Sequence, residues 1–325
     1  MTRRIGIHES VGELFPPERF ERAFESDGTA TGADERERTD GEKPIVETVG
    51  GDPEVLSALD VCVTLAYDES FLDGDLLWVH SVQAGVDRFP FAAFRERGVA
   101  LTSSEGIHGD VVGETVLGYL LAFARGLHRY RDAQGESDWI DPDWSELGTL
   151  RGERVCVIGL GTLGQGVVRR ADAFGMEVVG VKRTPTPVDG VKRVHTPANL
   201  EVAIEGSKFV VLCVPLTDET RGLIGSEELA AMDENCVLVN VSRGAVVEEG
   251  ALIEALDAGE IAGAALDVFE TEPLPEESPL WEREEVIVTP HVAAAYRGYA
   301  DRVAAIVREN LGRRERDESL ANRVV

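Results

Sequence analysis

Three side chains with the chemistry of an active site follow one another in the second half of the chain: Arg243, Glu272 and His291. The guanidinium of an arginine offers two parallel N–H donors that fit a carboxylate, and a histidine imidazole exchanges a proton near neutral pH. A glutamate beside that imidazole would orient it and stabilise its protonated form. Together, the three residue types predict a site that anchors a carboxylate and moves a proton.

The three residues stand in the stretches NVSRG, DVFETEP and TPH, and each stretch begins where a short apolar run ends. Apolar runs that alternate with helix-length segments are typical of β-α-β units and a parallel sheet. Ligands bind outside the carboxyl ends of the strands in open sheets of this kind. Six strands are expected in this part of the chain, at Val155 to Ile158, Glu177 to Val181, Phe209 to Val214, Val237 to Val241, Ala262 to Leu266 and Val286 to Val288.

A glycine-rich turn opens this series of strands, in the sequence VCVIGLGTLGQG at residues 155–166. Its Gly159 permits a tight turn, Gly161 lets the backbone approach a pyrophosphate, and Gly164 allows close packing of helix on strand. The free N–H groups at the start of the following helix favour a bound anion. A strand before the glycines, a helix pattern through Phe174 and a second strand together predict a dinucleotide site.

The choice of nicotinamide cofactor is expected to depend on the end of the second strand, where an acid would bind the ribose 2′-hydroxyl of NAD. This chain has Lys182, Arg183 and Thr184 there, and no acid. The two cations attract a 2′-phosphate and the threonine hydroxyl adds a donor. We therefore expect NADP(H) to be preferred, with NAD(H) possible if these residues only border a pocket of relaxed specificity.

The first hundred residues carry four further apolar runs that predict strands, at Ile5 to Ile7, Val61 to Leu65, Leu76 to Val79 and Val99 to Leu101. Residues Thr29 to Lys43 are polar and unpatterned, so a surface loop is expected there. Apolar residues at helical spacing predict one long helix from Gly109 to Arg129.

The order and spacing of these motifs resemble those of the D-isomer-specific 2-hydroxyacid dehydrogenases, and the resemblance covers nearly the whole chain, including VPLTDETRGLI at residues 214–224. It implies hydride transfer between a nicotinamide ring and C2 of a small 2-oxo acid or D-2-hydroxy acid. Arg243 would anchor the substrate carboxylate, His291 would be the acid or base, and Glu272 would orient His291. Residues 292–297 depart from the glycine- or serine-rich turn of the family, which leaves the shape of the substrate pocket open.

Further site residues are implied by the same resemblance. The loop SVQAGVD at residues 81–87 would receive the substrate carboxylate on backbone N–H groups, with Ala84 and Gly85 small enough for a close approach. Asp267 would hold the nicotinamide amide, and Val214 and Pro215 would form a wall beside the cofactor. The remaining expected cofactor contacts are Thr162, Leu163, Thr220, Val241 and Ser242.

The expected architecture is α/β, with two doubly wound parallel-sheet domains. Residues 1–104 and 292–325 would form a discontinuous, flavodoxin-like substrate domain, with a C-terminal helix from about residue 292. Residues 105–291 would form a Rossmann-type nucleotide domain. The active site would be the cleft between them, with closure around a hinge because the chain crosses twice. The family resemblance also implies a homodimer, with the helix that starts at Gly109 in its interface.

Two other functions stay open at this point. The chain also resembles C-terminal-binding-protein corepressors, which use the same fold as a dinucleotide-sensing scaffold for peptides. It resembles formate dehydrogenase as well, but that enzyme pairs its histidine with glutamine, because no proton has to move. Glu272 argues against formate dehydrogenase. Turnover of a 2-oxo acid would distinguish a dehydrogenase from the corepressor-like scaffold.

The charge and composition of the chain indicate which classes of binding partner are disfavoured. The net charge of −28 disfavours nucleic acid and anionic membranes, since like charges repel. Only four of the 32 basic residues are lysines, and an acidic, lysine-poor composition is typical of proteins from salt-accumulating halophiles. Four separated cysteines in apolar runs predict buried thiols, with no metal site. A polar start and the absence of a long apolar run predict a cytoplasmic protein.

Overall fold

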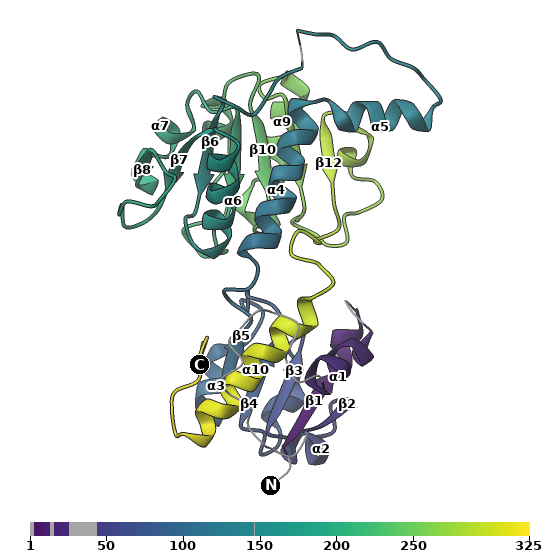
Figure 1. The fold of residues 1–325 in the computed structure, drawn as a ribbon, viewed down its shortest axis with the longest axis vertical. Coiled ribbons are helices and arrows are strands. Elements are labelled where there is room, and N and C mark those ends of the chain that lie inside the picture. The colour runs from purple at the N-terminus through teal and green to yellow at the C-terminus, as the bar shows by residue number, and fades with distance from the viewer. Residues whose placement is uncertain (1–2, 14–15, 26–43, 146) are drawn as a thin grey trace. The chain divides into compact units, whose positions relative to one another are not determined.

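A computed structural model of the chain describes residues 3–13, 16–25, 44–145 and 147–325. The chain divides into two compact units. The terminal unit consists of Met1–Ile107 and Tyr296–Val325, and the central unit consists of His108–Ala295. Each unit contains one parallel sheet with helices (Figure 1), which confirms the predicted α/β class.

The terminal unit has a five-stranded sheet in the order β2-β1-β3-β4-β5. All neighbouring strands are parallel, and this order is that of flavodoxin-like folds. The strands are β1 (Arg4–His8), β2 (Ile45–Val49), β3 (Val61–Thr64), β4 (Trp78–Ser81) and β5 (Ala100–Ser103).

Successive residues of these strands face opposite sides of the sheet, and each side has its own apolar core. Val61 and Val63 of β3 lie in the core that includes α1 and α10, whereas Cys62 lies in the opposite core. Figure 1 shows α1 and α10 on the same side of this sheet. The helices are α1 (Pro17–Glu25), α2 (Pro53–Ser57), α3 (Phe91–Arg97) and α10 (Tyr299–Glu315), with 3₁₀ turns η1 (Glu9–Glu13) and η2 (Glu69–Leu72).

The central unit has a seven-stranded parallel sheet in the order β12-β11-β10-β9-β6-β7-β8. The direction of winding changes between β6 and β9, which is the position where doubly wound sheets bind nucleotides. The strands are β6 (Arg154–Ile158), β7 (Glu177–Val181), β8 (Arg193–His195), β9 (Phe209–Leu212), β10 (Val237–Asn240), β11 (Gly263–Leu266) and β12 (Val286–Val288).

Helices cover both faces of this sheet. Val155 and Val157 of β6 pack with α4 and α6 on one face, and Cys156 and Ile158 pack with α7, α8 and α9 on the other. The helices are α4 (Gly109–Ala124), α5 (Leu127–Gly135), α6 (Thr162–Ala173), α7 (Leu200–Ile204), α8 (Ser226–Ala230) and α9 (Glu249–Ala258), with 3₁₀ turns η3 (Pro197–Asn199), η4 (Gly244–Val246) and η5 (Pro279–Glu282).

Helices α4 and α6 touch through their backbones. A Cβ atom on Gly166 would lie 1.8 Å from the carbonyl oxygen of Gly109, and one on Gly113 would lie 2.5 Å from the carbonyl oxygen of Gly166. No side chain fits at these contacts, so the glycines allow α4 to pack directly on α6, the helix that follows the glycine-rich turn (Figure 1).

Three sequence predictions need correction. The strand prediction omitted β2 and β8, which are edge strands with partly exposed residues. The predicted single helix from Gly109 is two helices, because Gly126 adopts the left-handed conformation with φ 62° and ends the first. The helix expected from about residue 292 begins at Tyr299. The predicted loop at Thr29 to Lys43 lies outside the described residues.

The four cysteines, Cys62, Cys156, Cys213 and Cys236, are buried and unpaired, as the sequence predicts. Burial raises the pKa of each thiol to about 12, which keeps them protonated and unreactive. Among the described residues, no helix is both long and apolar enough to cross a membrane.

Candidate active site

Three catalytic candidates follow adjacent strands of the central unit. Arg243 follows β10, Glu272 follows β11, and His291 follows β12. Since these strands are parallel neighbours, their carboxyl ends lie at one edge of the sheet. The local contacts of each loop show how the side chains are held there.

The loop that carries Arg243 is fixed by the buried side chain of Asn240. Its carboxamide oxygen accepts hydrogen bonds from the backbone N–H of Ser242 at 3.1 Å and from the Ser242 hydroxyl at 2.8 Å. Its amide nitrogen donates to the carbonyl of Arg243 at 3.0 Å. The half-buried guanidinium donates through Nη1 to the carbonyl of Ser242 at 2.7 Å. Asn240 thus fixes the turn through three hydrogen bonds, a role that its place in the sequence motif does not predict.

The next residue, Gly244, brings this loop against the one after β11. A Cβ atom at Gly244 would lie 1.8 Å from the carbonyl carbon of Phe269, so only a glycine fits. Phe269 in turn donates its backbone N–H to Oε1 of Glu272 at 3.1 Å. That bond fixes Oε1 of Glu272, so the other carboxylate oxygen, Oε2, can bind a different partner.

The partner of Oε2 is His291, whose Nδ1 lies 2.9 Å away. The side chains of Glu272 and His291 are 28% and 33% exposed, so a small molecule can reach the pair. Because Nδ1 faces a carboxylate, it carries the proton of the neutral ring and leaves Nε2 for a substrate. The structure thus brings together the two residues that the sequence paired.

The backbone at His291 adopts the left-handed conformation with φ 53°, which is uncommon for a residue with a side chain. The buried carboxylate of Asp267 stabilises this turn. It accepts the backbone N–H groups of Val292 and Ala293, each at 2.9 Å, and the hydroxyl of Thr289 at 2.6 Å. Asp267 therefore organises the histidine turn, and its predicted contact with nicotinamide stays a prediction.

A tyrosine on helix α4 completes this arrangement. The hydroxyl of Tyr119 lies 2.6 Å from the Thr289 hydroxyl. The single Thr289 proton goes to the Asp267 carboxylate, so Tyr119 is the donor. Burial raises the pKa of Tyr119 to about 12, which keeps that proton in place. Tyr119 and Thr289 thus hold the Asp267 carboxylate, and the sequence does not predict this contact because it joins residues 170 positions apart.

The glycine-rich turn has the geometry that a dinucleotide requires. Gly159 has φ 96°, and a Cβ atom there would lie 2.5 Å from the Cys213 carbonyl oxygen. A Cβ atom at Gly164 would lie 1.9 Å from the carbonyl oxygen of Gly159, whereas one at Gly161 would meet nothing within 4 Å. The middle glycine thus leaves open space at the start of α6, where Thr162 and Leu163 begin the helix.

The loops after β7 and β9 border this turn. The backbone N–H of Gly159 donates to the carbonyl of Val181, and Lys182 follows directly, with Arg183 and Thr184 exposed beyond it. After β9, Val214 is half-buried and Pro215 exposed, and Thr220 ties the loop together by donating to the Pro215 carbonyl at 2.6 Å. Val241 and Ser242, at the end of β10, are buried.

The predicted carboxylate-binding residues Ala84 and Gly85 belong to the terminal unit and follow β4. Ala84 is exposed and Gly85 is half-buried. Among the described residues, no group of three or more His, Cys, Asp or Glu side chains could hold a metal ion.

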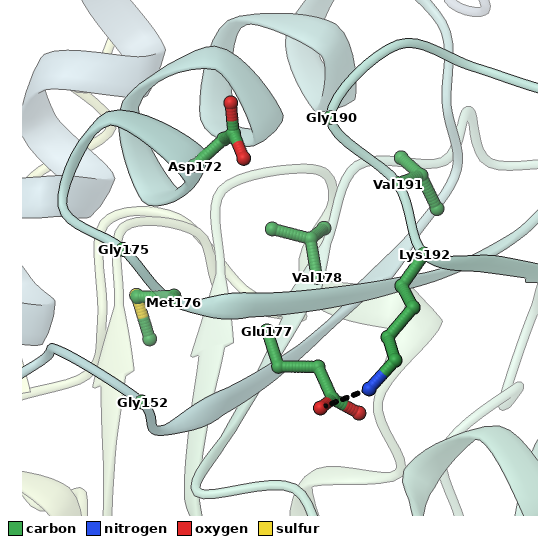
Figure 2. A pocket seen from close by; sticks show the side chains of 9 residues that line it. All are labelled: Gly152, Asp172, Gly175, Met176, Glu177, Val178, Gly190, Val191 and Lys192. Atoms are coloured by element: carbon green, nitrogen blue, oxygen red, sulfur yellow. Dashed lines mark hydrogen bonds and ion pairs between the residues drawn. The ribbon is translucent and has the colours of Figure 1, made fainter.

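A hollow of about 450 Å³ lies at the opposite edge of the central sheet. Figure 2 shows that Glu177 and Lys192 line it and form an ion pair, with 2.6 Å between Oε2 and Nζ. Glu177 begins β7, so this hollow is at the amino ends of the strands. The candidate catalytic residues all follow carboxyl ends, and the hollow is therefore not part of their site.

The comparison with protein families agrees with the geometry. The family described as D-isomer specific 2-hydroxyacid dehydrogenase, NAD binding domain, matches residues 117–293. The chain belongs to this family of NAD(P)-dependent oxidoreductases, which confirms the resemblance seen in the sequence.

Individual relatives give the same result. Glyoxylate reductase from Thermococcus litoralis is 33% identical over 271 residues, which cover 79% of this chain and 81% of that enzyme. D-3-phosphoglycerate dehydrogenase from Methanocaldococcus jannaschii is 36% identical over 242 residues, 74% of this chain, and the match spans only 46% of that longer enzyme.

Among solved structures, an NADPH-dependent glyoxylate/hydroxypyruvate reductase from Sinorhizobium meliloti, in complex with NADP and sulfate, has a TM-score of 0.79 and 28% identity. The alignment covers 100% of this chain and 98% of that one. The whole chain therefore has the fold of this family.

Proposed function

We propose that the protein is an NADPH-preferring reductase that converts a small 2-oxo acid to a D-2-hydroxy acid and catalyses the reverse oxidation. The observation that carries the proposal is the contact between Glu272 and His291, which are 2.9 Å apart and partly exposed. They lie in the loops after β11 and β12, and β11 is the neighbour of β10, which precedes the Arg243 loop. A carboxylate anchor and a proton donor are the two groups that this reaction asks of a protein.

His291 performs the proton transfer in this proposal. In the reductive direction it arrives as imidazolium, and Nε2–H gives its proton to the substrate oxygen as the C=O bond becomes C–OH. Nδ1–H stays bonded to Glu272, which stabilises the positive charge before the transfer. Arg243 binds the carboxylate through its fork of N–H groups and polarises the neighbouring carbonyl. The nicotinamide ring, when bound, supplies the hydride that reaches C2.

The residues of the central unit fit a nicotinamide dinucleotide. The open space at Gly161 and the free N–H groups at the start of α6 suit a pyrophosphate. The end of β7 carries Lys182 and Arg183, which would attract the 2′-phosphate of NADP. Support for the same cofactor comes from the Sinorhizobium meliloti reductase, which is NADPH-dependent by name and contains NADP.

The proposal includes a cytosolic homodimer adapted to high salt. Two exposed tryptophans support an interface between copies, because Trp139 and Trp144 are 92% and 84% exposed on the segment after α5. The excess of 60 acidic over 32 basic residues supports adaptation to salt, since carboxylates keep a surface hydrated.

Steady-state turnover tests the proposed function. Purified protein would be assayed at high and low salt with NADPH and NADH against glyoxylate, hydroxypyruvate, pyruvate and longer 2-oxo acids, with oxidation of the cofactor followed by absorbance. We expect reduction of at least one short 2-oxo acid, faster with NADPH. Binding of the cofactor without turnover of any 2-oxo acid would favour the scaffold function instead. Turnover of formate alone would favour the formate dehydrogenase alternative.

Replacing Arg183 with alanine should weaken the binding of NADPH far more than the binding of NADH. A charge-assisted contact with phosphate contributes about 1.5 to 3 kcal/mol, so KM for NADPH should rise about 10- to 100-fold while KM for NADH changes little. Arg151→Ala is the matched control, because Arg151 is also exposed but precedes β6 at the amino edge of the sheet. Equal losses with the two cofactors would remove Arg183 from the phosphate site.

A further inference from the structure

The loop after β4 is fastened to the terminal unit through three successive carbonyl groups. The Ser81 carbonyl accepts a hydrogen bond from the Ser104 hydroxyl at 3.1 Å. The Val82 carbonyl accepts one from the hydroxyl of Tyr299 on α10 at 2.5 Å. The Gln83 carbonyl accepts one from the backbone N–H of Ser104 at 3.0 Å. Two residues from distant parts of the chain thus fix the carbonyls of this loop.

The N–H groups that follow these carbonyls point to no protein acceptor. In the described residues, neither Ala84 nor Gly85 donates its backbone N–H to another residue. Ala84 is exposed, and Gly85 is half-buried. The carbonyls of residues 81–83 are engaged elsewhere, so the two adjacent N–H groups that follow them are unused donors within the described residues. Adjacent free N–H groups of this kind suit an anion such as a carboxylate.

The Ser104 hydroxyl is itself held by a buried chain of hydrogen bonds. Trp78 Nε1 and His80 Nδ1 both lie 2.8 Å from the Thr102 hydroxyl, and His80 Nε2 lies 3.1 Å from the Ser104 hydroxyl. The Ser81 carbonyl can only accept, so Ser104 donates to it and must accept from His80 Nε2. The proton of the neutral ring is therefore on Nε2, and Nδ1 accepts from Thr102, which accepts from Trp78. Burial lowers the pKa of His80 to about 3, so the ring stays neutral.

We propose that Ser104, Tyr299 and His80 are positioning residues that fix the loop so that Ala84 and Gly85 present their N–H groups to the substrate carboxylate. Ser104 contributes both a hydroxyl and a backbone N–H, and Tyr299 contributes the bond to the middle carbonyl. His80 holds the Ser104 hydroxyl in the orientation that reaches Ser81. This inference rests on the proposed function, since the carboxylate that the loop after β4 would bind is that of the proposed 2-oxo acid substrate.

Steady-state kinetics with glyoxylate tests the inference. Glyoxylate has no side chain, so its KM depends mainly on how its carboxylate is held. The variants are Ser104→Ala and Tyr299→Phe, each of which removes one hydroxyl. The matched control is Ser103→Ala, because Ser103 is the equally buried neighbour and its hydroxyl makes no hydrogen bond to any described residue.

A carboxylate bound equally in the ground state and transition state affects KM more than kcat. We expect Ser104→Ala and Tyr299→Phe each to raise KM for glyoxylate about tenfold, with kcat and the Kd of NADPH nearly unchanged. Hydrogen exchange measured by mass spectrometry should be faster in the peptide that spans residues 81–86 of both variants. Ser103→Ala should match wild type in KM and in exchange.

Three results would overturn the inference. In the first, wild type reduces glyoxylate, and Ser104→Ala and Tyr299→Phe have the same KM as Ser103→Ala. The hydrogen bonds of Ser104 and Tyr299 then have no positioning role, whereas the proposed function stands. If wild type binds NADPH but reduces neither glyoxylate nor any other 2-oxo acid of the panel, the proposed function fails and the inference fails with it. A loss of kcat and of NADPH binding together with KM would show a purely structural role.

Discussion

Replacing Arg243 with lysine should lower kcat/KM for the 2-oxo acid about 100-fold, because the loss of a charge-assisted, two-bond contact costs roughly 1.5 to 3 kcal/mol. Lysine keeps the positive charge but is a point donor that cannot reproduce a planar fork. The turn around Arg243 should survive, since Asn240 holds it through backbone atoms and Ser242. The loss should therefore be kinetic, with a normal thermal transition and normal cofactor affinity.

Arg151→Lys is the control for this substitution, because it makes the same chemical change at an exposed site on the amino edge of the sheet. Near-normal kcat/KM in Arg243→Lys would show that the guanidinium is not the carboxylate anchor. A large loss of NADPH affinity in the same variant would instead assign Arg243 to the cofactor site.

Replacing Glu272 with glutamine should move the pH dependence of reduction to lower pH. The Glu272 Oε1 atom accepts from the Phe269 N–H, so the glutamine oxygen takes that place and its amide nitrogen faces Nδ1 of His291. The imidazolium then meets an N–H donor in place of a carboxylate and gives up its proton more easily. The midpoint of reductive kcat/KM against pH should therefore move to lower pH.

The same substitution should slow oxidation of the hydroxy acid at all pH values. A glutamine N–H opposite Nδ1 favours the ring form that carries its proton on Nε2, and that form cannot accept a proton from the substrate. Glu270→Gln is the matched control, because it removes the same charge two residues away on an exposed side chain. Superimposable pH profiles for wild type and Glu272→Gln would show that His291 relies on a different acid.

Much of this site follows from local sequence patterns. Buried apolar runs predicted the inner strands of both sheets, because a parallel strand covered on two faces is apolar throughout. The glycine-rich turn, Glu272 and His291 lie where the local patterns placed them, since each follows such a run, and their roles in binding and catalysis stay predictions. The position of Thr220 is also set locally, because its hydroxyl donates a hydrogen bond to the Pro215 carbonyl within the same turn.

Other features depend on contacts between distant segments and leave little local signal. Tyr119 reads as one more apolar position of a helix, and its bond to Thr289 exists only because α4 packs on the sheet. Edge strand β8 has three partly exposed residues, too few for an alternating pattern. The break at Gly126 was missed because the helical spacing of apolar residues continues across it to Leu127.

We expect this chain to direct a hydride to C2 of a 2-oxo acid while His291 supplies the proton. The most direct test combines wild type and His291→Gln with NADPH deuterated at the transferred position and the best substrate of the 2-oxo acid panel. Mass spectrometry and chiral chromatography would then analyse the product. We predict that wild type forms the D-2-hydroxy acid with one deuterium at C2, and that His291→Gln binds NADPH normally but forms product at least about 100-fold more slowly. An L product or a product without deuterium at C2 would contradict hydride transfer to C2 that forms a D-2-hydroxy acid. An unchanged rate in His291→Gln would show that His291 is not the proton donor.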